Sequence, residues 1–296
     1  MISFIRHARG WGLALALTAL LAPVAVAAAD AEIRRADGTP ASVSDVAVAF
    51  ASADVVYLGE EHDDPVAHRL QAEWLAQACD RAGKRPVALA MEMFERDVQP
   101  VLDEYLADTI REKDLLTDAR PWPNYPSDYR PLVELAKARG VPVIAANAPR
   151  RYVSRVGRLG PSGVDGLSAQ ARRFLAPGPV PSASVAYAAK FREAMGDGDG
   201  HTAGPGLLAA QVLRDAAMAD AIARHLAAHP GALVVMVNGK FHSAGHLGIP
   251  EQLQRLRPAT RQLVVTMARR GGPEDTAPDG DFIVLTPPRT AAGPTP

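Results

Sequence analysis

Short apolar runs alternate along the chain with longer segments in which apolar residues recur at helical spacing. The apolar runs are continuous, which is typical of strands buried on both faces of a sheet. Asp64 and Pro65 open a predicted helix that ends near Arg81, and Gly140 ends another. The alternation predicts an α/β fold with a mainly parallel central sheet and helices on both faces. The predicted strands of this sheet are 54–58, 87–91, 141–146 and 233–238.

Two stretches interrupt this alternation. Residues 121–129 place three prolines among tryptophan and tyrosine side chains, so we predict an irregular aromatic loop there. Residues 177–206 open on three spaced prolines and carry a glycine–aspartate repeat near their end, which indicates an insertion of loop and helix. We place a short helix at about 184–195 in it and a long helix from about 206 to 228 after it. Closing strands are predicted at 262–267 and 282–285, and the tail 287–296 is predicted to be disordered.

The N-terminus has a pattern of its own. Arg6 and Arg9 precede an apolar run at 11–26, which ends in small residues up to Ala29. A basic head, an apolar middle and a small-residue exit are typical of a secretory signal peptide, here residues 1–29 with cleavage near its end. We therefore expect a periplasmic or secreted protein that meets a membrane only through its transient signal peptide. An uncleaved anchor is the alternative.

Composition and charge narrow the choice of partner. Of the 296 residues, 48% are hydrophobic and 22% are charged, which is ordinary for a globular protein with a sizeable core. The formal charge of −1 becomes −3 once Arg6 and Arg9 leave with the signal peptide, so we expect no nucleic-acid surface. Cys79 is the single cysteine, which excludes an internal disulfide and, since it lies far from the cleavage site, a lipid anchor on an N-terminal cysteine.

The pattern G-x-x-H occurs twice, at residues 59–62 and 239–242, and each copy directly follows a predicted strand. Parallel strands open their carboxyl ends at one edge of a sheet, and ligands bind at that edge in such folds. Two chemistries remain open: the acidic and imidazole side chains bind a divalent metal, or a carboxylate-oriented histidine acts on water as a base. A tight turn whose polar residue caps the next helix is the simpler alternative. The polar side chains at the predicted strand ends are Glu60, His62, Glu92, Asn147 and His242.

Arginine and aromatic side chains near the same edge would suit a flat ligand. Arg96 and Arg150 lie just beyond strand ends, where a guanidinium can bind a carboxylate such as a haem propionate. Tyr129 and Tyr187 can stack on a flat ring, and a tyrosine or histidine can be the axial ligand of haem. Local ion pairs and loop packing would explain these residues without a ligand. His68, in the first predicted helix, either faces the same edge of the sheet or is a surface or packing histidine. No C-x-x-C-H motif is present, so any haem would be bound non-covalently.

Five sequence blocks, in this order, resemble the ChaN-like haem-binding proteins of the Tiki/TraB-like superfamily. One such block alone would be a weak signal, but five in order are specific. The resemblance covers about residues 43–257 and implies an α/β domain whose core extends to about residue 286. The blocks lie within 58–71, 91–106, 147–150, 210–219 and 239–250.

The resemblance implies an exported protein linked to haem or iron uptake. Such a protein would bind haem or another small molecule. A homodimer bridged by this ligand is one form that the resemblance allows. It assigns the functional set to Glu60, His62, Glu92 and His242. The superfamily also includes metal-dependent proteases of the Tiki type, so a metal-dependent hydrolase or peptidase that uses the same residues is the alternative. The chain departs from many relatives because it lacks the lipoprotein cysteine.

Overall fold

The computed structural model describes residues 31–196, 205–275 and 279–289. The predicted signal peptide, the glycine–aspartate part of the insertion and most of the predicted disordered tail lie outside these residues. Within the described ranges, no helix is both long enough and apolar enough to cross a membrane.

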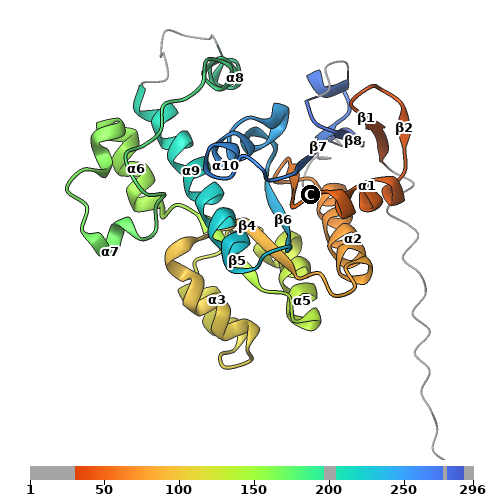
Figure 1. Ribbon diagram of the computed structural model, residues 1–296, viewed down its shortest axis with the longest axis horizontal. Helices are drawn as coiled ribbons and strands as arrows, with labels where there is room; N and C mark the ends of the chain where they lie inside the picture. Colours follow the sequence, from red (N-terminus) through yellow and green to blue (C-terminus); the bar gives the residue numbers. More distant parts are fainter. Residues whose placement is uncertain (1–30, 197–204, 276–278, 290–296) are drawn as a thin grey trace, which may run out of the picture.

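The strands of the described residues form one eight-stranded sheet, shown in Figure 1. Their order is β2-β1-β8-β7-β3-β6-β4-β5. β1 runs antiparallel to β2 and β8, and the other neighbouring pairs are parallel. Every residue of the central strands β3 and β6 is buried, as their continuous apolar runs predict, so the α/β fold is confirmed. The strands are β1 (Glu32–Arg35), β2 (Pro40–Ala41), β3 (Val55–Glu60), β4 (Val87–Glu95), β5 (Val143–Asn147), β6 (Leu233–Gly239), β7 (Gln262–Arg269) and β8 (Phe282–Thr286).

Helices cover both faces of the sheet, and successive residues of each strand point into two different cores. Val56 and Leu58 of β3 pack against α1, α2, α3 and α5 on one face. Val55 and Tyr57 pack against α9 and α10 on the other face. This separation follows from the two-residue period of a strand. The helices are α1 (Val43–Ala49), α2 (Pro65–Arg81), α3 (Gln99–Leu106), α4 (Glu112–Asp118), α5 (Arg130–Arg139), α6 (Arg150–Leu159), α7 (Ala169–Arg172), α8 (Val185–Met195), α9 (Pro205–Ala228) and α10 (Ile249–Leu256).

Three of these helices, α6, α7 and α8, form a separate group. Figure 1 shows α6 and α7 at the end of the molecule away from β1 and β2, and α8 near the beginning of α9. The group has its own apolar core, in which Val153 and Val156 of α6 pack with Tyr187 of α8 and Leu213 of α9. The short helix predicted inside the insertion is therefore present as α8, and it packs on the first half of α9.

The structure differs from the predictions at two places and adds an element at a third. The stretch predicted to be irregular contains a π-helical turn at Tyr125–Tyr129, which leads into α5; Pro126 lies at the start of that turn, where a missing N–H is tolerated. The strand predicted to end near Glu92 continues to Glu95, with a shift of register between Met91 and Glu95. The polar residues before α1, which carried no strand prediction, form the short edge strands β1 and β2.

Candidate functional site

The side chains singled out at the strand ends meet at one edge of the sheet. Glu60 is the last residue of β3, and His242 ends a short 3-10 turn that follows Gly239, the last residue of β6. Glu92 comes from the irregular part of β4, and its Oε2 accepts a hydrogen bond of 2.8 Å from the backbone N–H of Gly239. Glu60, Glu92 and His242 are all at least nine-tenths buried, while His62 is half-exposed. The parallel register of β3, β6 and β4 brings them together.

Glu60 is surrounded by four side chains that hold it as a buried anion. Its Oε1 accepts the hydroxyl of Tyr129 at 2.6 Å and lies 3.1 Å from Nδ1 of His62. Its Oε2 accepts the amide of Gln71 at 2.7 Å and lies 3.0 Å from Nε2 of His68. Burial alone would raise the pKa of Glu60, but the bonds from His62, His68 and Tyr129 outweigh it and lower that pKa overall. Glu60 therefore stays ionised and orients the imidazole of His62.

The second imidazole is held in the same way by Asp215, from the first half of α9. Nδ1 of His242 lies 2.6 Å from Oδ1 of Asp215, and the hydroxyl of Tyr187 donates to the other carboxylate oxygen. On its other side, Nε2 of His242 lies 3.5 Å from Oε1 of Glu92. Burial lowers the pKa of His242, but the charges of Glu92 and Asp215 raise it above its ordinary value overall. Burial raises the pKa of Asp215.

Gly239 lets the side chain of His62 approach the backbone at the end of β6. A Cβ atom at this position would lie 2.7 Å from both Cε1 and Nε2 of His62, and 3.7 Å from Oε2 of Glu92. The imidazole of His62 therefore rests directly on the backbone of β6 beside Glu92, which only glycine allows. Burial lowers the pKa of His62, but its bond to Glu60 and the charge of Glu92 raise it above the ordinary value overall.

The site thus contains two carboxylate-held histidines, and the charge of Glu92 acts on both. A carboxylate on Nδ1 fixes the tautomer of an imidazole and leaves Nε2 to accept a proton or to bind a ligand. The side chain of His62 is 42% exposed, whereas that of His242 is 8% exposed, so His62 is the imidazole that a ligand can reach. The ring of Trp122 stands edge-on to His62, with 4.8 Å between the ring centroids.

The donors of the site are not arranged as a metal cage. Within the part of the chain that the structure describes, no group of three or more His, Cys, Asp or Glu side chains could hold a metal ion. The physical reason is that the donors already bind one another: Glu60 and Asp215 bind the Nδ1 atoms, and Glu92 accepts a backbone N–H. The metal ligands predicted from the G-x-x-H pattern lie together, but their arrangement does not support a shared ion.

The four predicted haem contacts occupy different environments. Tyr129 and Tyr187 are 0% and 1% exposed, so neither ring presents a face to a flat ligand in this structure. Arg96 forms an ion pair of 2.8 Å with Asp220 of α9, and both side chains are largely buried. Arg150 starts α6 and lines a cavity to which residues of α8 and α9 also contribute. The structure therefore does not gather these four side chains around one ligand.

Asp215 and Gln71 are site residues that the pattern of strand ends did not reveal. Each lies on a helix among buried apolar neighbours, and both are almost fully buried. A polar residue at a buried position of a helix is the signal that could have identified them, because such a residue needs a partner inside the protein. His68, for which the sequence left site and core open, contacts Glu60 from α2.

Comparison with solved structures places this site in a known fold. A structure of ChaN of Campylobacter jejuni, described by its cofacial haem binding, is similar over 87% of this chain and 97% of that chain, with a TM-score of 0.65 at 18% identity. The structure of an erythromycin esterase in its open conformation is similar over 84% of this chain and 80% of that chain, at 14% identity. Its TM-score of 0.47 is too low to support an argument. The first likeness shows the fold.

Comparison of sequences adds the family. A curated relative, the chloroplastic protein RETICULATA-RELATED 5 of Arabidopsis thaliana, is 27% identical over 234 residues, which cover 73% of this chain. The match covers 31% of that protein, so the chain spans about a third of its length. The family described as haem-binding uptake, Tiki superfamily, ChaN matches residues 46–253. Because that match extends over more than half of the chain, this protein belongs to the ChaN family of haem-binding uptake proteins in the Tiki superfamily.

Proposed function

We propose that this chain is an exported haem-binding protein, with its ligand at the carboxyl ends of the strands and His62 as the axial ligand of the iron. Membership of the ChaN family supports haem as the ligand. The observation that carries the assignment of His62 is its imidazole, which is half-exposed and bound to the buried Glu60 through Nδ1. Among the described residues, Nε2 of His62 makes no hydrogen bond, so it is free to bind iron.

The environment of His62 suits an axial ligand. A carboxylate behind a histidine fixes the orientation of its ring and makes the other nitrogen a stronger donor to a metal. Trp122, which contacts the His62 ring, supplies an aromatic surface beside it. Haem bound there would supply the redox chemistry, while Glu60, His62 and Trp122 would hold and orient it.

The tyrosines are less suited to this role. A tyrosine binds haem iron as a phenolate, so it needs an accessible and acidic hydroxyl. Burial, together with the neighbouring carboxylates, raises the pKa of Tyr129 and of Tyr187 well above the ordinary value. Both hydroxyls also donate to site carboxylates.

Export, haem or iron uptake and a homodimer bridged by its ligand complete this proposal. The basic, apolar and small-residue pattern of residues 1–29 supports export. An exported protein that binds haem outside the cytoplasm would suit uptake. A flat ligand with two faces can contact two copies of the chain.

We expect haemin to shift its Soret band when titrated into the purified protein, and His62→Ala to bind it about 10- to 100-fold more weakly because the axial nitrogen is lost. His229→Ala is the matched control, since His229 is exposed and follows the far end of α9. An unshifted Soret band at micromolar haemin would rule out haem binding. A full shift in His62→Ala would leave haem binding but reject His62 as the ligand.

A second function, hydrolysis without a shared metal, is favoured by the position of Glu92. This carboxylate lies 3.5 Å from Nε2 of His242, and its charge also raises the pKa of His62. The Nδ1 atoms of both imidazoles are bound to other carboxylates. In such an arrangement, His62 can take a proton from water through Nε2 as the water oxygen bonds to the acyl carbon of an ester or peptide. Protonated His242 can give a proton to the leaving alcohol or amine as its bond to that carbon breaks, and proton exchange with solvent then restores both imidazoles. The geometry resembles a general base with its acid partner, which haem binding does not require.

This second function predicts that Glu92→Gln hydrolyses a panel of esters and peptides about 10²- to 10⁴-fold more slowly than the unaltered protein, yet binds haemin equally well. The base His62 must be neutral and the acid His242 must be protonated, and the pKa of each is raised from 6.5, so the rate should pass through a maximum above pH 6.5 and fall on both sides of it. Initial rates between pH 5 and pH 9 measure both effects. Hydrolysis that is absent throughout, or unchanged in the variant, would exclude this function.

A further inference from the structure

A cavity of about 420 Å³ is lined by residues of α6, α8 and α9. Figure 1 labels these three helices. The size of the cavity is within the range of pockets that hold small organic ligands. The residues described as lining it do not include any residue of the strand-end site. We call it the α6–α9 cavity, and the lining residues on which the argument depends are Arg150, Arg158, Phe191, Leu207, Gln211 and Arg214.

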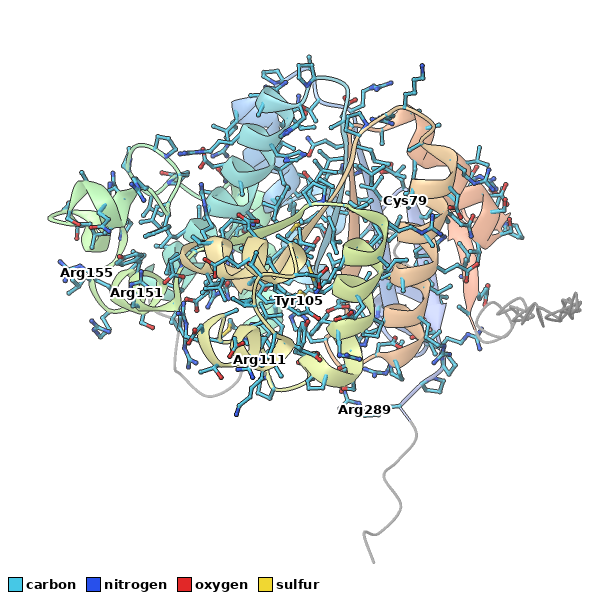
Figure 2. All side chains as sticks on the ribbon, turned by 90° about the horizontal axis from the view of Figure 1, so that it is seen from below. Cys79, Tyr105, Arg111, Arg151, Arg155 and Arg289 are labelled. Carbon is cyan, nitrogen blue, oxygen red and sulfur yellow. The ribbon has the colours of Figure 1, made fainter. Side chains whose placement is uncertain are left out.

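The cavity is rich in positive charge that no carboxylate of the described residues neutralises. In the described ranges, neither Arg150 nor Arg158 forms an ion pair, and Arg214 donates to an uncharged amide oxygen, that of Asn147, at 3.3 Å. The other two arginines of α6, Arg151 and Arg155, are not among the residues that line the cavity. Arg151 forms an ion pair of 2.6 Å with an aspartate, Arg155 donates to a backbone carbonyl at 2.8 Å, and Figure 2 shows both at the periphery of the molecule. Guanidinium groups without an acidic partner around a cavity favour an anionic ligand.

The other side of the cavity is apolar. Phe191 of α8 is buried beneath it, while Met195 and Leu207, at the facing ends of α8 and α9, are 53% and 46% exposed. Exposed apolar side chains beside a cavity gain most from a ligand that covers them. The amide oxygen of Gln211 is buried and has no hydrogen-bond partner among the described residues, so it offers an acceptor to a ligand or a water.

We propose that the α6–α9 cavity binds an amphipathic carboxylate. The apolar body of the ligand lies against Phe191 and Leu207, and its carboxylate pairs with Arg150 and Arg158. Two kinds of molecule share this chemistry: a fatty carboxylate, which has one acidic group on a flexible chain, and a tetrapyrrole, which has two acidic groups on a flat ring. The inference does not depend on His62 or on the proposed haem ligand, because the cavity and the strand-end site have no described residue in common.

Two probes test the inference on the full chain: dodecanoate by calorimetry, and metal-free protoporphyrin by fluorescence. The porphyrin lacks iron, so axial ligation by His62 cannot contribute, and His62→Ala should bind it unchanged. We expect at least one probe to bind, and Arg158→Glu to weaken it about tenfold or more by reversing a charge that meets the carboxylate. Arg151→Glu makes the same charge change on the same helix outside the cavity, and it should leave the affinity within about twofold of the unaltered protein.

A second variant removes the space instead of the charge. A Cβ atom at Gly157 would meet only Leu207 and Ala210, at 3.9 and 4.0 Å, so Gly157→Leu can extend into the cavity from a helix that tolerates leucine. It should abolish binding of either probe while circular dichroism shows a folded protein. Binding of dodecanoate alone, or of the porphyrin alone, identifies the ligand class. No binding of either probe, or equal affinity in Arg158→Glu and Arg151→Glu, would overturn the inference.

Discussion

Asp215→Ala is expected to lower the free energy of unfolding by about 3 to 5 kcal/mol, the cost of removing one partner from a buried charge pair. Asp215 is 1% exposed and binds both His242 and Tyr187. Without it, the imidazole and the phenol are left in the core with unsatisfied polar groups. Urea unfolding followed by circular dichroism measures the change. Asp80→Ala is the matched control, because Asp80 also pairs with a cation, Arg139, but its side chain is 59% exposed and such pairs contribute about 1 kcal/mol or less.

The same variant has a pH dependence whose sign follows from His242. The folded pKa of His242 is raised from 6.5, so the stability that its protonation contributes is complete below pH 6.5 and is lost as the pH rises through the folded value. Asp215 supplies part of that stabilisation. The cost of Asp215→Ala should therefore be larger at pH 6 than at pH 9. An unfolding midpoint like that of Asp80→Ala at both pH values would show that the pair does not support the fold.

Gly239→Ala is expected to remove axial ligation of haem while leaving the protein folded. The new Cβ atom would lie 2.7 Å from Cε1 and Nε2 of His62, which is closer than real contacts allow. His62 is half-exposed, so its ring can turn away at little cost in stability. The axial nitrogen then leaves its place, and haemin affinity should fall about 10- to 100-fold, as in His62→Ala.

Two comparisons sharpen this prediction. Gly157→Ala adds the same methyl group where the nearest atom is 3.9 Å away, so its thermal unfolding should stay unchanged. Gly59→Ala places its Cβ atom 2.7 Å from Oγ of Ser243 and 3.0 Å from the Cα atom of Lys240, so we expect it to lower stability first. Soret titrations and thermal unfolding of the three variants separate ligand binding from folding. Unaltered haemin binding by Gly239→Ala would show that the position of His62 does not matter for the ligand.

Local patterns were enough to predict much of the architecture. Continuous apolar runs identified the strands β3, β4, β5 and β6, because a strand covered on both faces has no polar side to show. The strand order could not be read in the same way. β6 lies between β3 and β4 although it follows them by more than 130 residues, and only packing of the whole chain decides that placement. The antiparallel pairing of β1 with β8 could not be predicted either, because β1 is a short polar strand without a periodic pattern.

The candidate site likewise contains residues that local sequence could predict and partners that it could not. Each G-x-x-H places a histidine after a buried strand, so local sequence could predict His62 and His242 and, with less detail, Glu60 and Glu92. The partners that set their chemistry come from elsewhere: Tyr129 from the turn before α5, and Asp215 from α9. These contacts join residues 69 and 27 positions apart, and a periodic pattern reports only neighbours within a few residues.

The sequence by itself determined the type of fold, the sheet edge at which the polar side chains gather, and the glycines that permit tight approach there. These features depend on local spacing, which a strand or helix converts directly into position. Only the tertiary structure decided that the two histidines are held by carboxylates of their own, that Tyr129 and Tyr187 are buried donors, and that arginines with no acidic partner among the described residues line part of a separate cavity. Those properties depend on burial and on distances between remote elements, which arise only when the helices close over the sheet.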